Sequence, residues 1–278
     1  MTQETGAKPV EHRGRKIEQG IRIQAPADRV WEAWADPVKI SQWFVDRAEG
    51  FAEAGATITW FFDAFNFRIS FHVLRSEPGK SYVVRWQEPP PGRDPGVLEI
   101  TLSQTGGVTT LRLVESGFRA GADWDEEYEG VSSGWTMALA LLKLYAENYF
   151  GQARASWMVL RPAAYTAEQV VPLERTADGL SRWLTRAGSV GAVGESCRLT
   201  LQSGETVSGR VLAQSKSETC VGWDEVHGSL EFKAFGTGPQ KMIGLRASAW
   251  AGGAARLEAA KPAMEAALDR WAAVLAAQ

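Results

Sequence analysis

The middle of the first half alternates between short apolar segments and turns, and this pattern most restricts how the chain can fold. Strand-like segments are expected at 57–62, 65–75, 81–88, 97–104 and 108–115. The residues between them are rich in Gly, Pro and Asp, which favour turns. Because connections this short join neighbouring strands that run in opposite directions, the sequence predicts an antiparallel meander.

Helices are expected on both sides of this meander. A strand at 15–24 precedes two short helices, the first begun by Pro26 and the second by Asp36 and Pro37. A long helix at about 123–150 follows the last strand, with apolar residues at helical spacing and an acidic first turn that suits the helix dipole. The predicted fold class is therefore α+β, an antiparallel sheet followed by a long helix.

The second half repeats this order of elements in a weaker form. The segment 178–184 is similar to 36–44, and 211–225 is similar to 73–88, at a near-constant offset of roughly 138 residues. An alanine-rich helix at 254–276 takes the place of the first long helix. Short matches also arise by chance between sequences of similar composition, but the shared order favours a duplication. The expected division is a flexible leader at 1–14, a first domain at 15–152 and a divergent second domain at 153–278.

Composition excludes several classes of protein. A length of 278 residues with 45% hydrophobic and 23% charged residues is typical of a globular chain with two domains. The net charge of −3 provides no basic surface for nucleic acid or an anionic membrane.

Cys197 and Cys220 have neither metal nor disulfide spacing, so both are expected to be reduced. The N-terminus has no signal-peptide pattern, and we expect a cytoplasmic protein.

Three sequence features resemble the START-like, or SRPBCC, helix-grip superfamily. They are the segment 21–31 with its Ala-Pro start, Asp36-Pro37 followed by Trp43-Phe44, and Gly134-Trp135 in the long helix. The branch that the chain resembles most is the bacterial homologues of the activator of heat-shock protein ATPase (AHSA1-like). The resemblance covers about 15–150, and the second half keeps only the order of elements. It implies tandem helix-grip domains, each a curved antiparallel sheet around a long C-terminal helix that encloses an apolar cavity.

One face of the predicted meander is almost entirely apolar, and this face is expected to point inward. Its residues are Ile58, Trp60, Phe62, Phe65, Phe67, Ile69, Phe71, Tyr82, Val84, Trp86, Leu98, Ile100, Leu102, Leu111 and Leu113. Most of them are interpreted as core that packs on the long helix. The many aromatic rings also predict a space of ligand size. The candidate ligand-binding residues are Trp60, Phe62, Phe67, Phe71, Trp86, Glu88, Glu115, Val131 and Trp135.

Two acidic residues, Glu88 and Glu115, continue the alternation of this inner face. A carboxylate that faces an apolar cavity would have a raised pKa and could orient a ligand or act as a general acid or base. The interpretation favoured for each is nevertheless a strand end in solvent, because ionised carboxylates are seldom buried without a partner.

The remaining polar residues form no catalytic or cofactor motif. His72 alternates with apolar neighbours and is expected to face outward, while His12 and His227 lie far from it in the sequence. No metal site, nucleophile–base pair or cofactor is therefore expected. The glycines at 191 and 194 lack the spacing and the lysine of a phosphate-binding loop.

Three functions remain in competition. The favoured one is a non-catalytic protein that binds a small apolar molecule, aromatic or polyketide-like, in the first domain. The second is a cyclase or aromatase that uses Glu88 or Glu115 as its acid or base. The third is a co-chaperone of a heat-shock ATPase, which the family resemblance implies. The second half is expected to pack on the first domain or on a second copy of the chain, so that a homodimer is one expectation.

Overall fold

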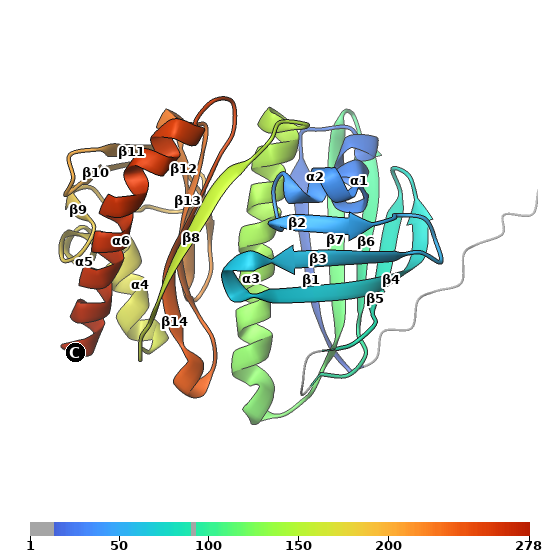
Figure 1. Ribbon diagram of the computed structural model, residues 1–278, viewed down its shortest axis with the longest axis horizontal. Coiled ribbons are helices and arrows are strands. Elements are labelled where there is room, and N and C mark those ends of the chain that lie inside the picture. Colours follow the sequence, from blue (N-terminus) through green and yellow to red (C-terminus); the bar gives the residue numbers. More distant parts are fainter. Residues whose placement is uncertain (1–13, 90–92) are drawn as a thin grey trace, which may run out of the picture.

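The computed structural model describes residues 14–89 and 93–278. The expected leader, apart from Gly14, and His12 lie outside the described residues. The described chain forms two antiparallel sheets, each followed by a long helix, as Figure 1 shows. The predicted α+β class is confirmed.

The first sheet has seven strands in the order β1-β7-β6-β5-β4-β3-β2. Their bounds are β1 Arg15–Ile23, β2 Arg47–Gly50, β3 Thr57–Phe62, β4 Phe67–Glu77, β5 Ser81–Trp86, β6 Val97–Thr105 and β7 Val108–Phe118. All neighbouring strands are antiparallel, which confirms the meander. Strand β2 was not expected, because its four residues carry no alternation of apolar and polar side chains.

Three helices accompany this sheet: α1 (Ala27–Ala35), α2 (Pro37–Ser41) and α3 (Asp125–Leu144), which continues into a π-helical turn at Tyr145–Tyr149. The carboxylate of Asp36 caps α2 by accepting hydrogen bonds from the backbone N–H groups of Val38 at 2.7 Å and Lys39 at 3.2 Å. Both expected short helices are therefore present, and the second has the predicted cap.

The second sheet repeats the topology of the first, with the order β8-β14-β13-β12-β11-β10-β9. The strands are β8 Ala155–Pro162, β9 Thr185–Ala187, β10 Ser196–Leu201, β11 Thr206–Gln214, β12 Glu218–Trp223, β13 Gly228–Phe235 and β14 Met242–Ala249, and the helices are α4 Ala167–Arg175, α5 Ala177–Ser181 and α6 Ala254–Ala276. In both sheets the first strand pairs with the last, and the second strand lies at the far edge.

Matching hydrogen bonds in the two halves support the duplication. The indole N–H of Trp43 donates to the carbonyl of Ala33 at 2.8 Å, and that of Trp183 donates to the carbonyl of Leu173 at 2.9 Å. Each bond joins the tryptophan that follows the second short helix to a carbonyl near the C-terminal end of the first short helix. The same tryptophan thus fixes the helix pair in both halves.

Strand register repeats as well. Val73 of β4 pairs with Val84 of β5, and Val211 of β11 pairs with Val221 of β12. A register shift follows directly after each of these pairs, so the two sheets carry an irregularity at the same place.

Helix α3 lies between the two sheets, and α6 covers the far face of the second sheet (Figure 1). The near face of the second sheet contributes Ala213, Cys220 and Trp250 to the core that surrounds α3. The indole N–H of Trp250 also donates to the carbonyl of Gln42 at 2.8 Å. The second half therefore packs on the first within one chain.

One expected strand begins two residues later than predicted. Phe65 was placed in a strand, but it lies in a 3-10 turn at Asp63–Phe65 and its residue surface is 44% exposed. Asn66 follows with a φ of 47°, a left-handed conformation that asparagine tolerates better than most residues. The turn therefore includes Phe65, and β4 begins at Phe67.

Candidate functional site

A cavity of about 660 Å³ lies between the first sheet, α3 and the near face of the second sheet. Its lining includes Trp60, Phe62, Phe67, Phe71, Trp86, Glu115, Val131 and Trp135, all of which were candidate residues. The remaining candidate, Glu88, is exposed and lies outside the lining, which agrees with the interpretation favoured for it, a strand end in solvent. The reason is that β5 ends at Trp86 and the alternation of faces ends with it.

Aromatic rings on neighbouring strands form the apolar wall of the cavity. Phe71 of β4 lies between Trp60 of β3 and Trp86 of β5, with ring centroids 4.7 and 5.3 Å apart and both contacts edge to face. On the opposite side, Phe44 stacks on Trp135 of α3 at 5.5 Å. Such rings bury large apolar areas while their rigid shapes leave space between the layers.

Glu115 is a buried acid of this cavity, and the expectation that it lies at a solvated strand end was wrong. Strand β7 continues three residues past it to Phe118, and the residue is only 2% exposed. Its Oε1 accepts a hydrogen bond from Arg93 at 2.7 Å, and its Oε2 accepts one from the indole N–H of Trp135 at 2.5 Å. The guanidinium compensates the buried charge, which removes the objection to burial.

Arg93 is a residue of the site that the sequence did not reveal, because it lies in a loop without periodicity. Its guanidinium also lies 4.0 Å from the ring centroid of Phe118 and 5.0 Å from that of Trp86. A close backbone approach holds this loop on β7: a Cβ on Gly96 would lie 2.1 Å from the carbonyl oxygen of Ser116. Gly96 was therefore the sequence feature that could have indicated the close approach of this loop to β7.

Two indole groups of the lining have no hydrogen-bond partner among the described residues. They are Trp60, which is 2% exposed, and Trp86. A buried donor without a partner costs about 1–3 kcal/mol. Each indole nitrogen has less than 1 Å² of accessible surface, so an acceptor oxygen of a bound molecule would reach these N–H groups only after the rings shift toward the cavity.

Gly134 keeps the α3 side of the cavity open. A Cβ at this position would meet nothing within 4 Å, although Gly134 lines the cavity. The glycine is therefore not required by the backbone, and a larger side chain would occupy cavity space.

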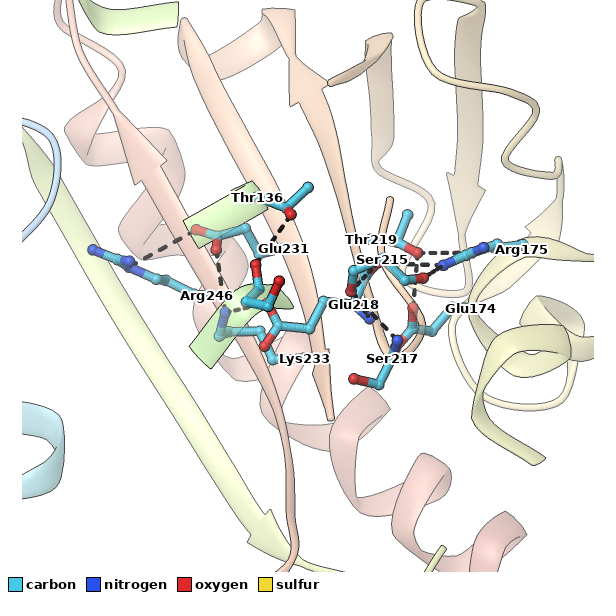
Figure 2. Close-up of polar contacts among 11 residues, drawn as sticks. Thr136, Glu174, Arg175, Ser215, Ser217, Glu218, Thr219, Glu231, Lys233 and Arg246 are labelled. Atoms are coloured by element: carbon cyan, nitrogen blue, oxygen red, sulfur yellow. Dashed lines mark hydrogen bonds and ion pairs between the residues drawn. The ribbon is translucent and has the colours of Figure 1, made fainter. Parts of the chain in front are cut away.

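The second sheet adds a charged wall to the same cavity, formed by Glu231 and Lys233 of β13 and Arg246 of β14. Strand register places Glu231 opposite Arg246, and Lys233 opposite Glu218 of β12. Figure 2 shows these side chains gathered in one cluster, in which Lys233 Nζ donates to Glu218 Oε2 at 2.8 Å. Burial opposes the charge of Lys233, but the carboxylates of Glu218 and Glu231 raise its pKa overall. This wall was not predicted, because the site was placed in the first domain alone.

The described residues contain no group of three or more His, Cys, Asp and Glu side chains that could hold a metal ion. His72 and His227 are both exposed. Cys197 and Cys220 are free and buried. Within the described ranges, no helix is long and apolar enough to cross a membrane.

Comparisons with known proteins agree with this architecture. Residues 24–147 match the family described as Activator of Hsp90 ATPase homolog 1-like protein. Protein MLL2253 from Mesorhizobium loti is 27% identical over 46% of this chain and 94% of its own, with a TM-score of 0.41. The Aha1 dimer from Colwellia psychrerythraea is 20% identical over 49% of this chain and 99% of its own, with a TM-score of 0.43.

A third solved structure extends over nearly the whole chain. The di-domain ARO/CYC BexL from the BE-7585A biosynthetic pathway is 13% identical over 95% of this chain and 99% of its own, with a TM-score of 0.45. No curated protein matches the sequence. Residues 24–147 thus match an AHSA1-like domain of the SRPBCC helix-grip superfamily, and the second sheet repeats the strand order of the first.

Proposed function

We propose that this protein binds a small, ring-bearing apolar molecule in the cavity on the first sheet. The observation that carries the proposal is a partly open cavity of about 660 Å³ whose wall on the first sheet is rich in aromatic side chains. Small-molecule sites are concave, mostly apolar and supplied with a few fixed polar groups. This cavity combines all three properties.

The polar groups indicate which ring compounds fit. The unpaired indole N–H groups of Trp60 and Trp86 call for acceptor oxygens, which a planar ring system with carbonyl groups provides. Anthraquinone is such a molecule, and it is the probe that we use in the tests below.

The hydrogen bonds of Glu115 favour non-catalytic binding over a cyclase or aromatase reaction. Both of its oxygens already accept hydrogen bonds, from Arg93 and Trp135, so the carboxylate is engaged by the protein. A general base must instead lie within hydrogen-bond reach of a substrate proton. The cyclase remains the second candidate because Glu115 lines the cavity. Turnover of a polyketide-like substrate that disappears in Glu115→Gln, with binding retained, would establish it.

The decisive experiment for binding fills the cavity from α3. Gly134→Leu should weaken anthraquinone binding at least tenfold in a titration of tryptophan fluorescence, because the new side chain occupies cavity space. Gly130→Leu is the matched control: the same helix carries it, a Cβ there also meets nothing within 4 Å, and Gly130 does not line the cavity. Equal affinity in both variants, or no binding by the unmodified protein, would reject the proposal.

The description of the matching family favours a further candidate, a co-chaperone that contacts a heat-shock ATPase. Such a contact uses the protein surface and does not need the cavity. Stimulation of an Hsp90-type ATPase that is equal in the unmodified protein and in Gly134→Leu would support it.

A homodimer also stays a prediction, and light scattering would measure the oligomeric state.

A further inference from the structure

The charged wall of the cavity comes from the half that was expected only to support the site. We propose that Glu231, Lys233 and Arg246 form a subsite for a neutral hydroxyl group at one end of the bound ring compound. This inference rests on the proposed function and assigns a specificity to it.

The unsatisfied state of Glu231 is the first argument. The residue is 1% exposed and lines the cavity, yet neither carboxylate oxygen has a hydrogen-bond partner among the described residues. A buried carboxylate without hydrogen bonds is among the costliest arrangements in a protein interior. Each of these oxygens has less than 1 Å² of accessible surface, so a donor in the cavity would remove that cost once the Glu231 side chain turns toward it.

The surrounding charges determine which donor fits. Lys233 Nζ lies 3.5 Å from Glu231 Oε2, and Arg246 Nε lies 3.8 Å from Oε1. Both are close enough to attract the carboxylate but too distant for normal hydrogen bonds. An ammonium group on the ligand would be repelled by these two cations and by nearby Arg154, whose pKa is lowered by burial and by Arg246.

A neutral hydroxyl avoids that repulsion. Its O–H can donate to Glu231, and its oxygen can accept from a neighbouring cation, since a hydroxyl has both functions. Because the same cavity is lined by Trp60 and Trp86, one molecule can place rings on the first sheet and a hydroxyl on the second. The ligand class is thus a planar ring system with a terminal phenolic or alcoholic hydroxyl.

The test compares three probes that share one ring system: anthraquinone, 2-hydroxyanthraquinone and 2-methoxyanthraquinone, at a pH at which the phenol is neutral. The unmodified protein should bind the hydroxyl compound about tenfold more tightly than the parent, as one charge-assisted hydrogen bond would give. The methoxy compound should lose this gain, because it keeps the oxygen but cannot donate. Because this comparison of three ligands uses the unmodified protein, it tests the inference even if a variant fails to fold.

Variants identify the acceptor. Glu231→Gln should abolish the preference for the hydroxyl, because the ionised acceptor is gone. Glu218→Gln is the matched control, since Glu218 is also 2% exposed and contacts Lys233 but does not line the cavity. It should keep the preference.

Different failures are distinguishable. Equal affinity for all three probes, or a preference that Glu231→Gln retains or that Glu218→Gln also removes, would overturn the subsite while leaving the cavity as a binding site. If no probe binds at all, the proposed function itself fails and the subsite with it.

Discussion

The two halves share one topology but differ in how a helix meets its sheet. In the second half, Trp183 stacks on Trp271 of α6 at 4.5 Å, and Ala260 and Ala267 of the same helix are buried against the sheet. In the first half, α3 presents Gly134 to open space beside the aromatic wall. The comparison teaches that the residues on the facing helix, and not the strand order, decide whether this fold encloses a cavity at that place.

The largest expected effect concerns the packed core of the second half. Trp271→Ala should lower the free energy of unfolding by about 3–5 kcal/mol, because it empties a site that is fully buried. Trp86→Ala, at a half-buried position beside the existing cavity, should cost less than half of that. Urea denaturation of both variants measures the difference. Similar losses at the two sites would contradict the contrast between a packed and a hollow core.

The next effect concerns the buried ion pair of the first half. Arg93→Met should lower the free energy of unfolding by about 3 kcal/mol, because it leaves Glu115 buried without its cation. Adding Glu115→Gln to this variant should recover most of the loss. The double-mutant cycle is read from denaturation curves, and a second substitution that recovers nothing would show that the pair does not carry the effect.

A smaller effect of opposite sign, a gain in stability, is expected at Glu174, one of the buried acids of the second half. Its Oε2 accepts a hydrogen bond from Thr219 at 2.7 Å, whereas its Oε1 has no partner among the described residues (Figure 2). Burial raises the pKa of Glu174 well above its usual value of 4.5. The native state therefore keeps this proton at a pH where the unfolded chain has lost it, and stability falls as pH rises above about 4.5.

Glu174→Gln should remove that loss. The free energy of unfolding of the variant should match that of the unmodified protein near pH 4.5 and exceed it at pH 8. Thermal denaturation at the two pH values measures this. A variant that is less stable than the unmodified protein at pH 8 would show that the carboxylate of Glu174 is ionised and compensated there.

The smallest effect concerns the division of the chain. We expect the halves at 15–152 and 153–278 to unfold together in the unmodified protein, because Arg154 donates to the carbonyls of Trp43 at 2.8 Å and Val45 at 2.6 Å. Arg154→Ala should broaden or split the calorimetric transition without removing either sheet. Two separate transitions already present in the unmodified protein would contradict this coupling.

The sequence predicted the site best along regular strands, where the alternation of side chains assigns each residue to one face of the sheet. Alternation along β3, β4 and β5 correctly predicted which side of the first sheet lines the cavity, from Trp60 to Trp86. The predicted element was wrong at Phe65, which lies in a turn although it still lines the cavity, and the alternation ends before Glu88 because β5 ends at Trp86. Arg93 was missed for the same reason, since a loop residue has no face that spacing can reveal.

Alternation and short turns determined the first sheet and its antiparallel pairing, because they specify local structure. The similar segments at a near-constant offset indicated that the second half repeats the order of elements. Only the tertiary structure decided that Glu231 is buried and Lys233 half-buried, since alternation with Leu230 and Phe232 is the usual pattern of a solvated face. Helix α3 packs on its own sheet and on β11 and β12 of the second sheet, so this face of the second sheet is turned toward the first half. Periodicity assigns a residue to a face, but only the arrangement of the two halves determines whether that face meets water, a ligand or another sheet.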